Sequence, residues 1–268
     1  MARGLRPGAV LGIVRELSAG RDPGPLVVAG PTVLADALRK ELGRAGEPGA
    51  IRGGPVEGAA ALVHVLAAAP TEEDEATLKA AHRARVPIVV VLAGPSLDDR
   101  IPYVLATDVV HTPAGAGFDI ERIAHVIAAR LGEQATGLAA RLPVLRGPVV
   151  AHLVERFSRM NGVVGAVVFV PGADFPVMTL NQIRMVLRVA HAHGVEVGQE
   201  RLPEVLATVG SGFAFRTVAR QLLGFVPVAG WAVKAGIGYG GTKAMGEAAR
   251  RYFGELAERG EGSVRSGS

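Results

Sequence analysis

The run PIVVVL at residues 87–92 constrains the fold more than any other part of the sequence, because it is apolar at every position and rich in β-branched residues. Successive side chains of a strand point to opposite faces of its sheet, so a strand of this kind is buried on both faces. Such burial is typical of parallel sheets that helices cover on both sides. The run therefore predicts an α/β domain built on a parallel sheet.

Segments on either side of this run repeat the alternation of strand and helix. Apolar, β-branched runs bounded by glycine and proline predict strands, and apolar residues three or four positions apart predict helices. The predicted strands are 26–29, a short one around 50–52, 59–68, 87–92 and 103–110. Two predicted helices begin near Thr32 and Thr71, and a third spans 119–131. This order predicts a parallel sheet wrapped by helices.

Two threonines are predicted to cap helices. Thr32 follows Gly30-Pro31, and the residues expected on one buried face after it are Val33, Leu34, Ala37, Leu38 and Leu42. Thr71 begins the run Thr-Glu-Glu-Asp74, where the hydroxyl can accept from first-turn amides and the acids favour the positive helix end. We interpret this acidic run as helix capping and not as a metal site.

The sequence changes character near residue 140. Residues 132–148 contain Gly132, Pro143, Gly147 and Pro148 and predict a linker, after which only helical patterns follow. We expect an arm or helix at 1–20, an α/β domain at 21–135, an all-α domain of helical hairpins at 148–256 and a flexible tail at 257–268.

The second half predicts two helices before its last apolar segment. A charged amphipathic helix is expected at 149–160, with 162–170 as its apolar continuation. After Pro171, Gly172 and Pro176, a helix capped by Thr179 and ended by Gly194 is expected, because Leu180, Ile183, Val186, Leu187 and Ala190 recur at helical spacing. His191 and His193, two positions apart, are interpreted as polar residues that end this helix and not as ligands of one metal.

Polar side chains of this half form one candidate cluster, which is either a functional site or a set of caps and interhelical hydrogen bonds. Its members are Asp174, Thr179, Asn181, Gln182, Arg184, Thr242 and Lys243. The nearby run Gly236-Ile-Gly-Tyr-Gly-Gly241 matches a dinucleotide-binding pattern, but no predicted strand precedes it. We instead expect Gly236 and Gly240 to allow close packing of helices.

Two apolar segments raise the question of a membrane. Residues 160–180 and 222–241 are interrupted by prolines and by Asp174 or Lys234, so neither predicts a simple span. Broken segments of this kind suit hairpins that dip into one leaflet, and they equally suit the buried hairpins of a helical bundle. The sequence leaves both interpretations open.

Composition limits the classes of function. The 268-residue chain has no cysteine, which removes disulfides and thiolate metal sites. Its net charge of +4 and aromatic content of 4% do not predict a nucleic-acid surface. No catalytic triad, carboxylate pair or metal-ligand pattern stands out, so we expect no catalytic residues, no cofactor and no metal. The first twenty residues do not predict an export signal.

The segments ALVHVLAAAPTEED at 61–74 and PIVVVLAGPS at 87–96 resemble a strand, an acidic helix start and a following strand of small bacterial GTPases of the translation-factor class. The resemblance covers residues 60–131 and implies a G-domain-like α/β fold. The nucleotide motifs are absent, because Ala35, Asp36 and Ala37 stand where a phosphate loop starting at Gly30 needs Gly-Lys-Ser/Thr, and 93–96 lack Asn-Lys-x-Asp. We expect no nucleotide hydrolysis here.

Ordered motifs in the second half, PGADFPVMTLNQIRM at 171–185, PVAGW at 227–231 and GYGGTKAMGEAARRYF at 238–253, resemble the bacterial GTPase-associated domain of unknown function. That domain also forms the C-terminal part of the YcjF inner-membrane proteins. The resemblance covers about 150–255. It implies membrane association, a GTPase partner, and a location in the cytoplasm or at the cytoplasmic face of the inner membrane.

These observations favour a non-catalytic adaptor that attaches to a membrane surface or self-assembles as a homo-oligomer, and that acts with a GTPase. The alternative is an enzyme or nucleotide-dependent switch whose site lies between the two halves. An intact GTPase encoded beside this chain would favour the adaptor, and nucleotide retained through purification would favour the switch.

Overall fold

The computed structural model describes residues 23–94, 100–113, 115–167, 175–195 and 230–265, together with residues 12, 197, 205 and 207. The chain divides into two compact units, and the division falls inside helix α6 (Arg146–Val167), between His152 and Leu153. We call the described residues from 23 to His152 the α/β unit, and those from Leu153 on the helical unit.

A parallel sheet forms the centre of the α/β unit, and its five described strands have the order β2-β1-β3-β4-β5. The strands are β1 (Leu26–Ala29), β2 (Ile51–Arg52), β3 (Ala61–Leu66), β4 (Ile88–Ala93) and β5 (Val109–Thr112), and every neighbouring pair is parallel. Residues 88–92 are buried on both faces of the sheet. The α/β prediction drawn from the run at 87–92 is therefore confirmed.

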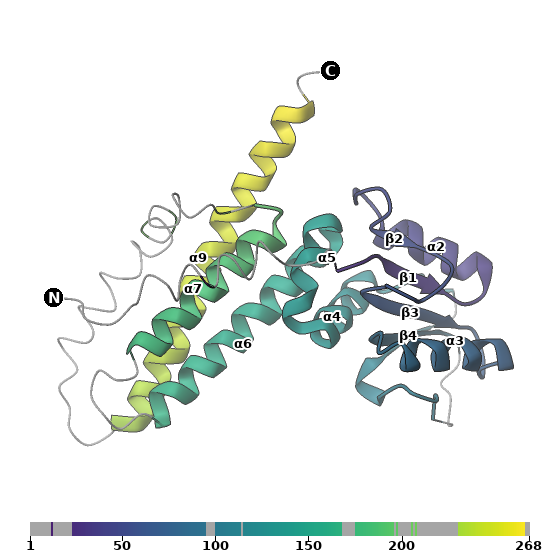
Figure 1. The fold of residues 1–268 in the computed structure, drawn as a ribbon, viewed down its shortest axis with the longest axis horizontal. Coiled ribbons are helices and arrows are strands. Elements are labelled where there is room, and N and C mark those ends of the chain that lie inside the picture. The colour runs from purple at the N-terminus through teal and green to yellow at the C-terminus, as the bar shows by residue number, and fades with distance from the viewer. Residues whose placement is uncertain are drawn as a thin grey trace. The chain divides into compact units, whose positions relative to one another are not determined.

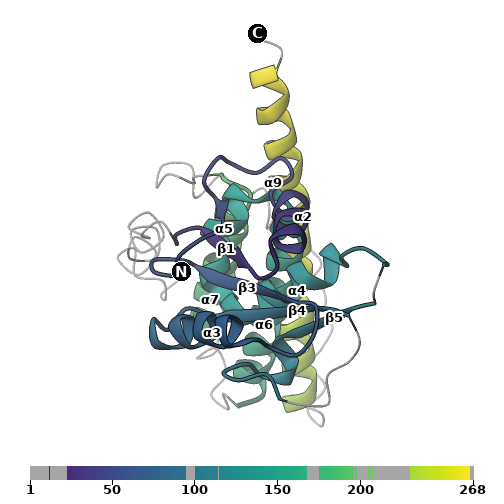
Figure 2. The same cartoon turned by 90° about the vertical axis from the view of Figure 1, so that its right-hand side faces the viewer.

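Helices cover the two faces of this sheet (Figure 1). The connections from β1 to β2 and from β3 to β4 run in opposite directions across it. Because such crossovers are right-handed, α2 (Thr32–Leu42) and α3 (Glu72–Arg83) lie on opposite faces (Figure 2). The side chains of Leu78 and Ala81 on α3 join one core with Leu62 and Val90 of the sheet. Helix α4 (Ile120–Leu131) follows β5 and begins at the cap Asp119.

The two predicted threonine caps have different outcomes. Thr71 is confirmed, since its hydroxyl accepts from the Asp74 amide at 3.3 Å while the Asp74 carboxylate accepts from the Thr71 amide at 2.9 Å. Thr32 was wrong as a cap, because Pro31 is the capping residue and no side chain bonds the α2 amides. The face that α2 buries consists of Ala35, Leu38 and Leu42, which leaves Val33 81% exposed.

The predicted strand at 103–110 was wrong over most of its length. Residues Ala106–Asp108 form a 3-10 turn, and β5 begins only at Val109. Tyr103 has a φ angle of 66°, in the left-handed region that a strand excludes. Its ring packs against that of His82 with 4.9 Å between centroids. Val104 packs against the core that includes Leu78 and Ala81 of α3, so an apolar residue here does not indicate a strand.

Residues 132–148, predicted to be a linker, are helical and packed. They form η2 (Gly132–Gln134), α5 (Ala135–Arg141), η3 (Pro143–Leu145) and the start of α6. The side chains of Leu138, Leu142 and Leu145 are buried. Glycine and proline mark helix ends here, since Gly132 ends α4 and Pro143 begins η3. Glycine and proline indicate a linker only where the residues between them are not apolar, and here those residues include buried leucines.

The described segments of the helical unit are helices, as expected. Helix α6, α7 (Phe175–Ala192) and α9 (Gly230–Arg265) lie side by side (Figure 1). Asn161 of α6 bonds Met178 and Thr242, while Val154 faces Gly246. Helix α6 is therefore antiparallel to both α7 and α9. Its C-terminal end meets the N-terminal ends of the other two.

The bounds of these helices correct two expectations. Thr179 is not a cap, because α7 starts four residues earlier, at Phe175. Pro176 sits in the first turn, where a missing amide costs nothing. Gly194 does end the helix, with φ 74° and the Val195 amide donating to Ala190 at 3.0 Å. Helix α9 continues to Arg265, through most of the predicted tail.

Other expectations fall outside the described residues. They concern the arm at 1–20, the apolar residues 168–170, Asp174 and the segment 222–229. Among the helices that the structure does describe, none is both long enough and apolar enough to cross a membrane.

Candidate functional site

Asn161, on α6, holds three helices together from a fully buried position. Its Nδ2 donates to the Thr242 hydroxyl of α9 at 2.8 Å and to the Met178 carbonyl of α7 at 3.2 Å. Its Oδ1 accepts from Nδ2 of Asn181 at 2.8 Å. A buried amide is tolerated only when its donors and acceptors are paired, and here they are paired across helices.

Gln182 extends these bonds, since its Nε2 donates to Thr242 Oγ1 at 3.2 Å. Asn161, Asn181, Gln182 and Thr242 therefore form a single set of hydrogen bonds, which we call the polar network. Asn181 and Thr242 are buried as well. In such surroundings each polar group depends on its partners, so the network defines how α6, α7 and α9 are aligned.

Close approach of α9 to α6 and α7 makes the network possible. A Cβ atom at Gly238 would lie 2.5 Å from the Asn161 carbonyl oxygen, and one at Gly246 would lie 2.6 Å from Val154 Cγ2. Gly236 and Gly240, predicted to be the packing residues, face open space, so that prediction was wrong. The contacting positions are Gly238, Thr242 and Gly246, four residues apart. The dinucleotide-like glycine pattern is thus part of a helix.

The structure brings together three of the seven candidate residues, namely Asn181, Gln182 and Thr242. Arg184 is exposed on α7, Thr179 lies inside α7, and Asp174 is outside the described residues. Asn161 was missed, although a lone amide inside the apolar run from Met160 to Val167 was a signal for a buried polar contact. His193 Nδ1 lies 2.9 Å from the Val189 carbonyl, in keeping with a polar residue at a helix end.

Lys243 belongs to a separate surface group on α6 and α9. The Tyr239 hydroxyl donates to Glu155 Oε2 at 2.9 Å, and Lys243 Nζ lies 3.2 Å from that hydroxyl and 3.4 Å from the carboxylate. Hydrogen bonds from Arg159 and Tyr239 lower the pKa of Glu155, and bonds to Tyr239 and Glu155 raise the pKa of Lys243. Both groups stay charged near neutral pH, which suits a clamp between helices better than proton transfer.

In the α/β unit, a buried histidine pairs with a partly buried acid. His64 of β3 is 1% exposed, and its Nε2 lies 2.7 Å from Asp74 Oδ1 at the start of α3. Burial lowers the pKa of His64 despite the bond to Asp74. Burial opposes ionisation of Asp74 too, but the bonds from Thr71 and His64 outweigh it and lower the pKa of Asp74.

This pair does not extend to a nucleophile. Because Asp74 is ionised, a neutral His64 donates from Nε2, and its Nδ1 has no hydrogen-bond partner in the structure. A triad would need a hydroxyl or thiol on that nitrogen. The sequence did not single out this pair, since a lone histidine in a strand gives no signal until the fold places α3 above it.

The start of α2 stands where a phosphate loop would be. Gly30 has φ 119°, and a Cβ there would collide with the Val65 carbonyl, so glycine is required for the turn. Pro31 has no amide to donate, and Asp36 forms an ion pair with Arg39. The lysine of α2, Lys40, lies in the last turn of the helix and not at its start, where a phosphate would bind. Within the described residues, no group of three or more acidic or histidine side chains is placed to hold a metal.

Comparison of the chain with models of protein families, with curated proteins and with solved structures found no match.

Proposed function

We propose that this protein is a non-catalytic adaptor, whose helical unit attaches it to a membrane surface. The observation that carries the proposal is the exposure of large apolar side chains at one end of the helical unit. Met160 and Val163 lie near the end of α6, Val177 lies in the first turn of α7, and Ile237 lies near the start of α9. All four are exposed, and we call them the apolar end.

The antiparallel arrangement explains why these residues gather, because α6 ends where α7 and α9 begin. The chain that continues from this end has the sequence VFV at 168–170, and the chain that leads to it reads LLGFVPVAGWAV at 222–233. Neither segment contains a charged residue. Apolar surface next to uncharged sequence supports shallow insertion into the boundary between headgroups and acyl chains, about 5–10 Å deep.

The magnitudes suit reversible attachment. Full burial of a large apolar side chain contributes about 1.5–3 kcal/mol, and the residues of the apolar end are already partly covered. Four such side chains contribute on the order of 4 kcal/mol together. That is comparable to a weak lipid anchor and needs further contacts to become stable.

A GTPase is the partner class that we propose for the adaptor. The support is the resemblance of the second half to the GTPase-associated domain, together with an α/β unit that lacks the phosphate-binding lysine. The same resemblance supports a place at the cytoplasmic face of the inner membrane. If a GTPase is encoded beside this chain, a binding assay with the two purified proteins tests this part of the proposal.

Sedimentation of the full chain with vesicles of phosphatidylglycerol and phosphatidylcholine tests the attachment. Val163→Asp places a charge at a side chain that is 62% exposed, so the core is left intact. We expect it to weaken vesicle binding roughly tenfold, since aspartate loses the apolar contribution of valine, about 1.5–3 kcal/mol on full burial, and is repelled by anionic headgroups. Leu256→Asp is the matched control, because Leu256 is 40% exposed near the other end of α9. It should bind as the parent does.

Sedimentation equilibrium without lipid tests whether the apolar end binds a second copy of the chain instead of a membrane. If the parent ignores vesicles but self-associates, and Val163→Asp alone abolishes the association, then the apolar end binds another copy of the chain. If Val163→Asp changes neither behaviour, the apolar end is not an attachment surface and the proposal fails.

A further inference from the structure

We propose that the α/β unit binds an acidic, apolar-containing segment of a partner protein at the C-terminal end of α3. The surface consists of His82, Arg83, Arg85, Tyr103 and Leu105, and we call it the α3-end surface. The proposal rests on the adaptor function in one respect, which is that an adaptor requires a partner and this surface would bind it. Its evidence comes from a different unit of the chain than the apolar end.

Two of the members of this surface are exposed apolar side chains. Tyr103 is 45% exposed and Leu105 is 62% exposed. Their neighbours Ile101 and Val104 pack against the core beneath α3, so the segment is fixed to the unit. The Tyr103 ring rests on the His82 ring at 4.9 Å. An anchored, exposed tyrosine suits binding, because few rotamers are lost when a partner covers it.

The backbone at Tyr103 supports the same interpretation. Its φ of 66° lies in the left-handed region, which residues other than glycine rarely adopt. Strain of this kind persists only where surrounding contacts hold it, and it is concentrated at functional sites. Here it holds a tyrosine against the end of a helix with nearly half of its side chain exposed.

Two arginines add positive charge at this end of α3. Arg83 and Arg85 are exposed, and neither makes an ion pair with any described residue. Asp108, close to Leu105 in the chain, is buried and pairs with Arg130 at 3.2 Å. The two arginines are thus available to bind carboxylates, which guanidinium groups bind in bidentate geometry.

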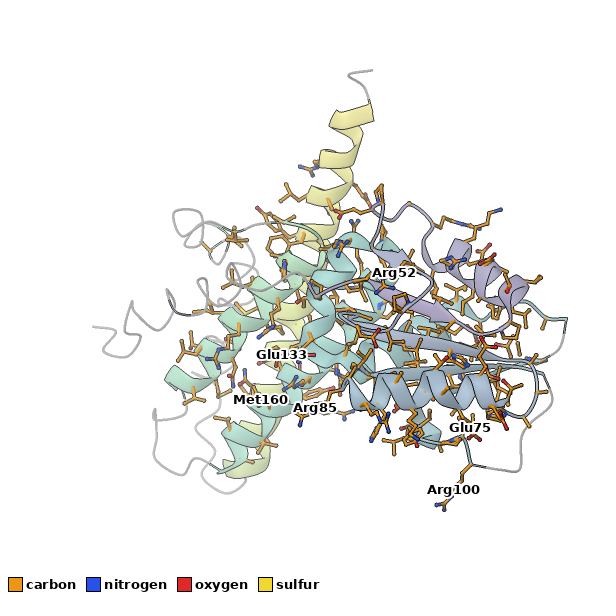
Figure 3. The ribbon with its side chains drawn as sticks, turned by 45° about the vertical axis from the view of Figure 1, so that its right-hand side comes forward. Arg52, Glu75, Arg85, Arg100, Glu133 and Met160 are labelled. Carbon is orange, nitrogen blue, oxygen red and sulfur yellow. The ribbon has the colours of Figure 1, made fainter. Side chains whose placement is uncertain are left out.

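The acids of α3 do not neutralise this end. Glu72, Glu73, Asp74 and Glu75 all lie in the first turn of the 12-residue helix, and Figure 3 shows Glu75 and Arg85 at opposite ends of it. A helix of this length spans about 18 Å, whereas the Debye length at physiological salt is about 8 Å. The two ends of α3 therefore present separate charges, and the basic end attracts an acidic ligand.

A protein segment fits better than a nucleic acid. Strands of nucleic acid are held by several cations along the backbone and by free aromatic faces on which bases stack. This surface has two arginines, and its one tyrosine ring is already stacked on His82. Tyrosine and arginine are the side chains enriched at protein interfaces, and Leu105 supplies an apolar contact.

Selection from a phage-displayed library of random peptides against the immobilised full chain tests the proposal. We expect the recovered peptides to combine Asp or Glu with a large apolar residue. Synthetic copies should bind Arg85→Glu and Leu105→Asp at least tenfold more weakly than the parent. Arg122→Glu, the same charge reversal at an exposed arginine of α4, is the matched control and should leave the affinity unchanged.

Tyr103→Gly separates binding from folding. Glycine removes the ring and also relieves the left-handed conformation, so the thermal midpoint should not fall while peptide affinity drops several-fold. The proposal is overturned if no peptide is recovered, if the recovered peptides lack carboxylates, or if they bind Arg85→Glu as they bind the parent. Tighter binding of a single-stranded DNA probe than of the peptides would also overturn it. Vesicle binding should be the same in Arg85→Glu as in the parent, whereas Val163→Asp should keep peptide binding, so the two proposals fail separately.

Discussion

At the scale of single residues, His64 is the group whose ionisation the fold opposes most clearly. Its pKa lies below the ordinary value of 6.5, because burial outweighs the hydrogen bond to Asp74. When pH falls through 6.5, the unfolded chain takes up a proton that the folded chain does not. Stability therefore falls with falling pH. The contribution of Asp74, whose pKa is also lowered, is lost only below its ordinary value of 3.8.

We predict that His64→Gln flattens the dependence of unfolding free energy on pH between about pH 7 and pH 5. Glutamine can place an amide donor near the position of Nε2, so the bond to Asp74 can persist without a titrating group. Urea unfolding at several pH values measures the slope for both chains. An equal slope in the variant would mean that His64 is not the group responsible.

Asn161 is the residue on which the polar network depends. We predict that Asn161→Ala lowers the unfolding free energy by about 3–5 kcal/mol, because each buried group left without a partner costs about 1–3 kcal/mol. In a double-mutant cycle with Thr242→Val, the two changes should be non-additive by about 1 kcal/mol or more. Arg184→Ala, at an exposed position of α7, should stay within about 0.5 kcal/mol of the parent.

At the scale of elements, α9 distinguishes glycines that pack from glycines that do not. Gly238→Ala would place Cβ 2.5 Å from a backbone oxygen and 2.8 Å from Met178 Cε, whereas Gly240→Ala meets nothing within 4 Å. We predict a net loss of about 1–2 kcal/mol for the first change and a gain of up to about 1 kcal/mol for the second. Denaturation midpoints of the two variants check this, and midpoints that shift in the same direction contradict it.

Helix α3 depends on its first turn. We predict that Thr71→Ala costs about 1 kcal/mol through loss of the cap. Asp74→Ala should cost about 2–4 kcal/mol, because it removes the same capping box and also leaves the Nε2–H of His64 buried without an acceptor. Glu72→Ala, in the same turn, loses only an exposed charge and should cost less than about 1 kcal/mol. Thermal unfolding of the three variants should give this order.

At the scale of the whole molecule, the limits of the α/β unit differ from those expected for the α/β domain. The compact unit runs to His152, so residues 136–152, with the buried Leu138, Leu142 and Leu145, belong to it. We predict that a fragment of residues 21–152 unfolds cooperatively, whereas 21–135 is partly unfolded at room temperature. Removal of three buried leucines costs on the order of 5 kcal/mol, comparable to the whole stability of many domains. Circular dichroism on heating distinguishes the fragments, and equal midpoints contradict the prediction.

Features that depend only on neighbouring residues could be predicted before the fold was known. Unbroken apolar, β-branched sequence identified the buried strand within 87–92, side-chain chemistry identified the cap at Thr71, and the freedom of glycine identified the helix end at Gly194. Each follows from local backbone geometry, which a short stretch of sequence specifies.

Which surfaces pack against each other became clear only from the fold. Val33 and Leu34 are equally apolar, yet only packing on the sheet shows that Val33 is exposed. Positions 236 and 238 are both glycine, but only Gly238 faces the backbone of Asn161. Asn161 and Thr242 are hydrogen-bonded although they are 81 residues apart in the chain. The prolines and glycines of 132–148 were interpreted as a linker, because the packing of the leucines between them depends on distant residues. The physical reason is that local patterns limit each segment to a few conformations, whereas burial and hydrogen bonds between distant residues select the pairs that stabilise one another.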